Sequence, residues 1–284
     1  MNYKEKEKLI QARVAALLEE NAVNYIIGWG ATRYADKTRA LFVRTSGEAK
    51  NLVYSEYCTQ SLAKYLTGDR WPEGKIAILA RGCESRAINR MIKDNQIDRS
   101  NLVILGIPCE GTASERCTNC QVHDPVVYDE LLWESGKSGA EKPADNVRYR
   151  QADEVDSLSG AEKKAYWEDV YSRCIRCYAC RNACPVCTCL ECYVDMHRTG
   201  FQGKRHTVAD NQTFGITRAF HVGDRCIECG ECERACPMGL PILAQTQKIL
   251  KEIETLAGDY MQGMDPDQEN FLGAFDLEDK DDFL

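Results

Sequence analysis

The first half of the chain alternates short apolar runs with segments of helical periodicity. The clearest pattern is an apolar run at residues 75–80 (KIAILA), a helical segment at 85–97 and a second apolar run at 101–107 (NLVILGI). Runs that are apolar throughout are typical of strands buried on both faces, and a strand–helix–strand unit places its strands parallel. Further elements are expected as strands at 23–27, 40–44 and 52–55 and as a short helix at 59–66. We therefore expect an α/β domain with a small parallel or mixed sheet over residues 1–133.

The first twenty residues (MNYKEKEKLIQARVAALLEE) predict an amphipathic helix. Their charges have both signs, and one face carries Leu9, Ile10, Val14, Leu17 and Leu18. This composition is unlike an export signal, and no apolar run approaches the roughly 18 to 20 residues that a membrane span needs. We expect a cytoplasmic protein without a membrane span.

A polar stretch at residues 134–160, rich in Ser, Gly, Lys and Asp, is predicted to be a linker. A helix is expected at 161–170, where it leads into a cysteine-rich domain over residues 161–250. Residues 251–284 are predicted to form an acidic C-terminal tail. This tail is expected to be a solvated end, with a docking strap as the alternative because phenylalanine and leucine interrupt the acids.

The net charge of -8 is concentrated in this tail. Residues 258–284 hold nine acidic residues and one lysine, which leaves 35 acidic and 35 basic residues in the rest of the chain. Because the body is nearly neutral, bulk electrostatics argue against nucleic acid as a partner.

The cysteine-rich domain contains an internal repeat. RCIRCYACRNACP at residues 173–185 aligns with RCIECGECERACP at residues 225–237, with all four cysteines at the same offsets. Each copy is C-x2-C-x2-C-x3-C-P, the run of bacterial two-cluster ferredoxins, in which the fourth cysteine ligates the other cluster. We therefore expect an α+β ferredoxin-like domain with two [4Fe-4S] clusters. One is assigned to Cys174, Cys177, Cys180 and Cys236, and the other to Cys226, Cys229, Cys232 and Cys184.

Five of the sixteen cysteines fall in the α/β half, and four of them could form one site. Cys83 and Cys109 each follow one of the two buried runs, so parallel strands would bring both to the carboxyl edge of the sheet. Cys117 and Cys120 form a C-x2-C in the next loop, close enough to fold over that edge. A third [4Fe-4S] cluster is the favoured interpretation, and a zinc site or plain buried cysteines are the alternatives.

The segments ARGCES, GIPCEG and ERCTNC resemble the cluster-binding core of the beta subunits of deazaflavin-reducing hydrogenases and related formate dehydrogenases. In that family, such cysteines bind a [4Fe-4S] cluster beside a flavin. The second half is similar to the iron–sulfur part of shorter relatives associated with heterodisulfide-reductase-like complexes. Here the domain order is reversed, and no G-x-G-x-x-G supports a dinucleotide site. The GWG at residues 28–30 is expected to be a strand-ending turn.

Three further cysteines, Cys187, Cys189 and Cys192, crowd into CPVCTCLEC directly after the first run. A metal role is expected. They could hold a fourth cluster with Cys58 or with a ligand from a partner, form a zinc site with His197 or His206, or shield the neighbouring cluster. Cys58 alone is expected to be a core residue. Five arginines flank the runs and are interpreted as charge compensation for anionic clusters: Arg173, Arg176, Arg181, Arg225 and Arg234.

The leading hypothesis is an electron-transfer subunit of a cytoplasmic anaerobic oxidoreductase complex, whose partners would be catalytic and flavoprotein subunits. The chain shows no acid/base or nucleophile pattern that would support catalysis by itself. One alternative is a subunit that carries a flavin such as FAD and itself reacts with a hydride donor. A second alternative is a zinc-stabilised scaffold.

Overall fold

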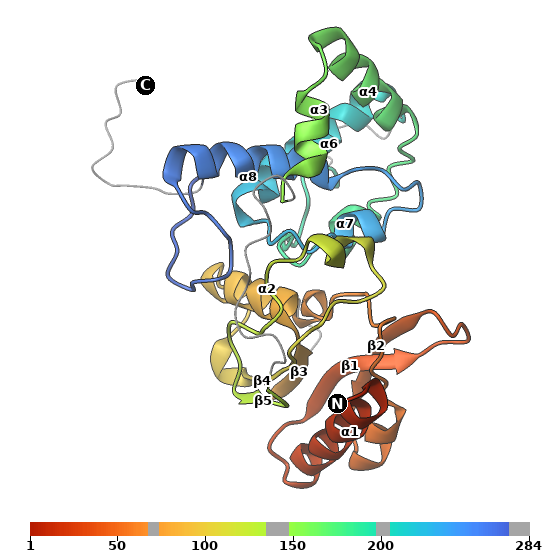
Figure 1. The fold of residues 1–284 in the computed structure, drawn as a ribbon, viewed down its shortest axis with the longest axis vertical. Helices are drawn as coiled ribbons and strands as arrows, with labels where there is room; N and C mark the ends of the chain where they lie inside the picture. The colour runs from red at the N-terminus through yellow and green to blue at the C-terminus, as the bar shows by residue number, and fades with distance from the viewer. Residues whose placement is uncertain (68–73, 135–147, 197–204, 273–284) are drawn as a thin grey trace.

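A five-stranded mixed sheet forms the centre of the N-terminal half of the protein. The computed structural model describes residues 1–67, 74–134, 148–196 and 205–272 (Figure 1). The strand order is β2-β1-β3-β4-β5, with β2 antiparallel to β1 and the other neighbours parallel. The strands are β1 (Tyr25–Ala31), β2 (Thr38–Val43), β3 (Ile76–Ala80), β4 (Leu102–Gly106) and β5 (Glu130–Leu131). The expected α/β domain with a mixed sheet is thus confirmed.

The strand–helix–strand unit at the centre of the sheet follows the apolar pattern. Every residue of β3 is buried, and its register with β4 runs from Ile76 beside Leu102 to Ala80 beside Gly106. Helix α2 (Gly82–Lys93) connects them and lies between the sheet and the C-terminal half (Figure 1). The carboxyl ends of β3 and β4 therefore point toward the cysteine-rich part of the chain.

Helix α1 (Tyr3–Glu19) forms as its amphipathic pattern predicts. Asn2 and Glu5 make a capping box at its start, and the apolar face buries Ile10, Val14 and Leu17 in the core. The helix packs against the 3₁₀ turn η1 (Ser46–Asn51). None of the helices in the described parts of the chain is both long and apolar enough to cross a membrane.

Three local predictions differ from the structure. The strand expected at 52–55 is reduced to one bridge between Gly30 and Leu52, and the helix expected at 59–66 is only the 3₁₀ turn η2 (Ala63–Leu66). The GWG sequence lies inside β1 instead of ending it. A Cβ on Gly28 would lie 2.4 Å from Leu52 Cδ2, so this strand position requires glycine for close packing.

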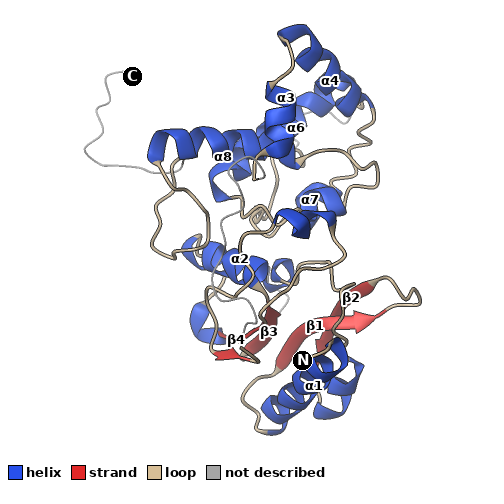
Figure 2. Cartoon of the chain, in the orientation of Figure 1, coloured by secondary structure: helices blue, strands red, loops and turns tan. Residues whose placement is uncertain are grey.

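The regular elements in the described C-terminal half are helices joined by the cysteine-bearing loops (Figure 2). Helix α4 begins at a capping box made by Ser159 and Glu162 and corresponds to the helix expected at 161–170. The helices are α3 (Arg150–Asp156), α4 (Gly160–Ser172), α5 (Ala179–Ala183), α6 (Val208–Val222), α7 (Glu231–Arg234) and α8 (Leu243–Ala257).

The predicted linker and tail are both shorter than expected. Helix α3 falls inside the predicted linker, where Arg148 and Tyr149 are buried and α3 packs on α8. The remaining linker residues, 135–147, lie outside the described residues. Helix α8 extends seven residues into the predicted tail.

The following residues, 258–272, are largely exposed, but residues 260–263 among them are buried or half-buried. They return to α2 (Figure 1), and we call this segment the C-terminal strap. Arg86 Nε donates to the Gln262 carbonyl at 2.8 Å, and Asn89 Nδ2 donates to the Gly263 carbonyl at 3.0 Å. The strap packs because its backbone carbonyls satisfy buried polar side chains of α2. The rest of the tail, 273–284, lies outside the described residues.

Candidate metal centres

The two repeated cysteine runs have the same backbone conformation. Arg176 and Glu228 hold equivalent positions and have φ of 48° and 57°. Two residues later, Tyr178 and Gly230 have φ of 61° and 72°, and each precedes a short helix. A left-handed conformation costs a residue other than glycine about 1–2 kcal/mol. Its recurrence at matching positions shows that both loops are held in one shape, which turns backbone N–H groups inward. Glu228 N donates to Cys226 Sγ at 3.4 Å.

The fourth cysteine of each run lies beside the other run. Burial raises the pKa of Cys174, and the neighbouring charge of Cys236 raises it further. Burial likewise raises the pKa of Cys226 to about 12 and that of Cys229 well above its usual range, and the charge of Cys184 adds to both. Helices α5 and α7 pack against each other and bring the runs together. Cys236 therefore lies near the first run and Cys184 near the second.

The four cysteines of the N-terminal half line one cavity at the carboxyl edge of the sheet. Cys83 lies in the first turn of α2 directly after β3, and Cys109 follows β4. Cys117 and Cys120 come from the loop that contains η4 (Glu115–Asn119). The cavity is also lined by Cys229 of the second run. The N-terminal thiols therefore adjoin one of the two thiol sets of the repeat.

Local contacts fix this N-terminal set. The Gly111 amide donates to Cys109 Sγ at 3.3 Å, and Thr112 Oγ1 lies 3.1 Å from Cys117 Sγ. The chain passes so close to the start of α2 that a Cβ on Gly82 would lie 2.3 Å from the Val122 carbonyl oxygen.

The chemistry of these four thiols fits a bound cationic group. Burial raises the pKa of Cys83, Cys109 and Cys120, so as free thiols they would keep their protons at neutral pH. Metal ions bind the thiolate and displace the proton, so a cluster would supply the positive charge that the buried site lacks.

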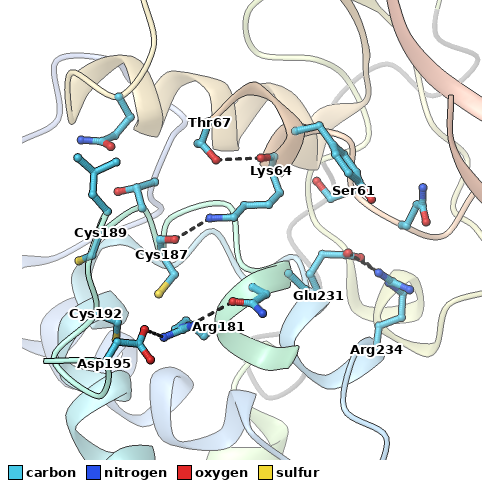
Figure 3. A pocket seen from close by; sticks show the side chains of 17 residues that line it. Ser61, Lys64, Thr67, Arg181, Cys187, Cys189, Cys192, Asp195, Glu231 and Arg234 are labelled. Carbon is cyan, nitrogen blue, oxygen red and sulfur yellow. Dashed lines mark hydrogen bonds and ion pairs between the residues drawn. The ribbon is translucent and has the colours of Figure 1, made fainter. Parts of the chain in front are cut away.

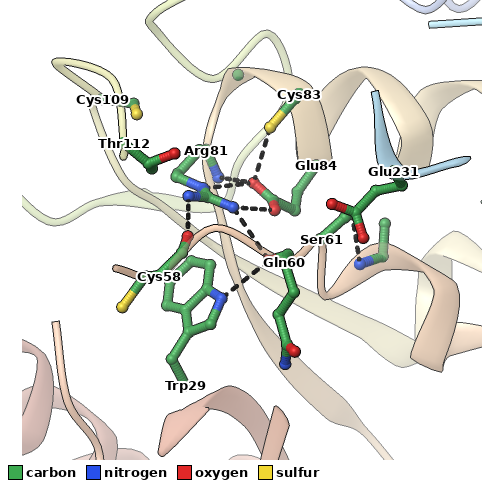
Figure 4. Close-up of polar contacts among 12 residues, drawn as sticks. Trp29, Cys58, Gln60, Ser61, Arg81, Cys83, Glu84, Cys109, Thr112 and Glu231 are labelled. Atoms are coloured by element: carbon green, nitrogen blue, oxygen red, sulfur yellow. Dashed lines mark hydrogen bonds and ion pairs between the residues drawn. The ribbon is translucent and has the colours of Figure 1, made fainter. Parts of the chain in front are cut away.

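A buried ion pair between Arg81 and Glu84, which the sequence did not indicate, lies next to Cys83 of this site. Arg81 and Glu84 are both buried, and Arg81 Nη2 lies 2.6 Å from Glu84 Oε1 (Figure 4). Burial alone would raise the pKa of Glu84, but the Arg81 charge and its hydrogen bonds lower it overall. The Arg81 guanidinium stacks over the Trp29 ring at 4.6 Å, and Cys83 Sγ donates to Glu84 Oε2 at 3.3 Å. The pair thus ties the strand core to the Cys83 loop.

Cys187, Cys189 and Cys192 line one wall of a separate cavity of about 600 Å³ (Figure 3). Burial raises the pKa of Cys187 to about 11, with the charge of Cys184 the next cause. Lys64 Nζ donates to the Cys187 carbonyl at 2.6 Å, which joins this loop to the N-terminal half. The three thiols therefore share a cavity and adjoin the second thiol set of the repeat.

Cys58 does not join this cavity. It is fully buried in the N-terminal core, where its Sγ contacts the Ser55 amide at 3.4 Å and the Val53 carbonyl at 3.7 Å. The expectation of a core residue is therefore confirmed, and the idea that Cys58 completes the Cys187 set is wrong. His206 is exposed and does not line the cavity, and His197 lies outside the described residues.

Four of the five flanking arginines already pair with carboxylates. These pairs are Arg173–Asp169, Arg181–Asp195, Arg225–Asp94 and Arg234–Glu231. The fifth, Arg176, donates to the Arg205 carbonyl. Because the charges of the four are balanced locally, the interpretation of these arginines as counter-charges for the clusters is weakened.

A second buried network joins the two halves of the protein. Glu228, in the second run, accepts from Arg148 Nη2 at 2.8 Å, and Arg148 also bonds Glu254 and the Tyr260 carbonyl. Arg116 Nε donates to the Glu228 backbone carbonyl at 2.6 Å. These residues are far apart in the sequence, and no spacing signal could have linked them.

Within the described parts of the chain, no three His, Cys, Asp or Glu side chains converge closely enough to hold a single metal ion.

Comparison with protein families concerns the part of the chain that contains the repeated cysteines. A family model described as a 4Fe-4S dicluster domain matches residues 170–240. The match begins in α4 and ends after the second run, so it spans both cysteine runs and Cys187, Cys189 and Cys192. The chain is an iron–sulfur protein.

Comparison with curated proteins extends the similarity to most of the chain. The beta subunit of F420-dependent formate dehydrogenase from Methanocaldococcus jannaschii is 24% identical over 323 aligned positions, which cover 79% of this chain and 83% of that subunit. The chain is related to this beta subunit. The resemblance seen around Cys83, Cys109 and Cys117 is thereby confirmed.

A second formate dehydrogenase beta subunit shares a shorter segment. The beta subunit of F420-dependent formate dehydrogenase 1 from Methanococcus maripaludis is 50% identical over 34 residues, 10% of this chain and 9% of that subunit. The longer alignment must reach well beyond the dicluster domain, because residues 170–240 are about a quarter of the chain. The relation to formate dehydrogenase beta subunits therefore includes part of the α/β half.

Proposed function

We propose that the chain is an electron-transfer subunit that relays single electrons within a cytoplasmic, multisubunit anaerobic oxidoreductase complex. A hydrogenase, a formate dehydrogenase or a heterodisulfide-reductase-like enzyme would provide the complex. The dicluster domain and the relation to a formate dehydrogenase beta subunit support this proposal. The observation that carries it is the position of Cys229, which lines the cavity of the four N-terminal cysteines.

Three sets of cysteines would hold three [4Fe-4S] clusters, each of which can accept and release one electron. The first set is Cys174, Cys177, Cys180 and Cys236. The second is Cys226, Cys229, Cys232 and Cys184. The third is Cys83, Cys109, Cys117 and Cys120.

The shared wall at Cys229 gives these sets an order. The N-terminal set adjoins the second set of the repeat, and the second set adjoins the first through the packing of α5 on α7. Electrons would therefore pass along a line with the N-terminal site at one end. The contact of Arg116 with Glu228 joins the second run to the N-terminal half and would maintain this spacing.

Cys187, Cys189 and Cys192 are proposed to bind a further metal centre. Only three thiols face their cavity, so the fourth ligand would be a non-cysteine group or come from a partner subunit. The neighbouring Cys184 would place such a centre beside the second cluster. Catalytic and flavoprotein subunits are the partners that a chain of clusters would connect.

A second candidate function, a flavin-bearing subunit that reacts with a hydride donor, is favoured by the same cavity. Its volume of about 600 Å³ lies within the roughly 300–1,000 Å³ range of cofactor pockets. Lys64 lines this cavity and would offer a cationic group to a flavin phosphate, as in FAD, whereas Arg181 and Arg234 already pair with Asp195 and Glu231.

Iron, sulfide and flavin analysis of anaerobically purified protein tests both candidates. About eight irons per chain would leave only the ferredoxin pair, about twelve would add the N-terminal cluster, and about sixteen would add the Cys187 centre. Stoichiometric flavin together with cluster bleaching by a hydride donor would replace the pure relay with the flavin-bearing enzyme. Zinc without iron or sulfide would refute both.

A further inference from the structure

We propose that Arg218 of α6 is a shared counter-charge for the two clusters of the dicluster domain and sets both reduction potentials together. This inference rests on the proposed function, because it requires that both clusters are present. The side chain is 5% exposed, although it belongs to the most polar class of residue. A guanidinium this deeply buried requires a negatively charged partner.

Arg218 is deeply buried without a carboxylate. Within the described residues it forms no ion pair, and its Nε has no hydrogen-bond partner. Its Nη2 donates a hydrogen bond to the Cys180 carbonyl at 3.1 Å. By contrast, Arg81, Arg90 and Arg148 are similarly buried, and each pairs with an acidic side chain. An unpaired buried charge is strongly destabilising, so Arg218 requires a negatively charged group other than a carboxylate in its surroundings.

The thiols of the two cluster sets supply the negative charge around Arg218. Burial lowers the pKa of Arg218, but the charges of Cys184, Cys232, Cys180 and Cys187 raise it, and the net effect is a rise. Cys180 belongs to the first set, whereas Cys184 and Cys232 belong to the second. Packing agrees with this placement, because Arg218 Nη2 donates to the Cys180 carbonyl and Val222, one turn along the same face of α6, shares a packed cluster with Cys184. The guanidinium therefore lies between the two sets, and its free Nε–H can donate to an acceptor there.

This position predicts a common effect on both potentials. Each electron that enters either cluster from a one-electron donor adds one negative charge beside Arg218, so the cation favours reduction of both. When the electron then passes from one cluster to the other, the charge beside Arg218 is unchanged. Arg218 should therefore raise both potentials and leave the difference between them nearly unchanged.

The test is a redox titration of the anaerobically purified holoprotein, followed by electron paramagnetic resonance of the reduced clusters. Arg218→Gln removes the charge, and Arg218→Lys keeps it. Arg225→Gln is the matched control, because Arg225 flanks Cys226 but pairs with Asp94 at 3.6 Å. Iron and sulfide are counted for every variant.

We expect Arg218→Gln to shift both potentials to more negative values, further than Arg225→Gln does, and Arg218→Lys to restore most of the shift. Unchanged potentials in Arg218→Gln, or a shift confined to one cluster, would overturn the proposal. If Arg218→Gln does not retain iron, retention by Arg218→Lys supports a charge effect, and equal loss in both variants overturns it. Failure of the proposed function is distinct, because the wild-type protein would then hold fewer than about eight irons.

Discussion

Arg116 donates from Nε to the backbone carbonyl of Glu228 at 2.6 Å, and its Nη2 lies 3.7 Å from the Glu228 carboxylate. Arg116 directly precedes Cys117 of the N-terminal site, and Glu228 lies between Cys226 and Cys229 of the second run. Two loops that would each hold a cluster are thus joined side chain to backbone.

Removal of Arg148 should destabilise the protein strongly. Arg148→Met leaves the buried Glu228 carboxylate with the weaker contact to Arg116 at 3.7 Å, and we expect a loss of up to about 3–5 kcal/mol in the free energy of unfolding. Urea unfolding under anaerobic conditions measures it. The control is Arg150→Met, whose pair with Glu154 is exposed and should contribute at most about 1 kcal/mol. Equal losses in the two variants would contradict the buried network.

Gly230→Ala should be unfavourable for two reasons. The residue has φ of +72°, and an added Cβ would lie 2.8 Å from Arg116 Cγ. We expect a loss of about 1–3 kcal/mol, measured as the shift of the thermal unfolding midpoint with iron content checked in parallel. Gly160→Ala is the matched control, since it begins α4 with no atom within 4 Å of the added Cβ. That substitution should be neutral or stabilising, and a comparable loss there would refute the steric argument.

Cys109→Ala should remove the N-terminal cluster alone. We expect the iron content to fall by about four per chain while the spectra of the ferredoxin pair persist. Cys58→Ala is the matched control, because Cys58 is a buried cysteine of the same half that lies in the core. It should keep all of its iron and lose only some stability. Equal iron content in Cys109→Ala and wild type would remove Cys109 from the ligand set.

Alkylation with iodoacetamide should show whether Cys187 and Cys189 bind metal. If they are ligands, both resist alkylation in the holoprotein and react after iron is removed. If they are free, the exposed Cys189 reacts quickly near pH 8 and Cys187 slowly, because burial raises the pKa of Cys187 to about 11 and little thiolate is present. The Cys187 rate should then climb as the pH rises toward 11. Mass spectrometry of peptides measures both rates.

The sequence predicted the elements whose signal is local. The repeat predicted the paired loops because cysteine spacing and backbone shape are coupled, and KIAILA and NLVILGI predicted the central strands because both faces are buried. The linker prediction was wrong at Arg148 and Tyr149, which look polar by composition but are buried by contacts made about 100 residues away. Arg218 gave no signal at all, because a helix sequence does not show which of its charges is buried without a partner.

The C-terminal strap has a consequence for the rate of the relay. The chain passes from the sheet to the cysteine-rich half and then returns at Gln262 and Gly263 to contact α2. The two halves are therefore joined both by this strap and by the contact between Arg116 and Glu228. A Cβ on Gly263 would lie 2.2 Å from the Arg86 carbonyl oxygen, which shows how closely the strap fits. Electron tunnelling weakens steeply with distance, and the two connections would keep the distance between the clusters of the two halves constant. Passage across the junction should therefore be insensitive to solvent viscosity, unlike a relay that waits for a swinging domain.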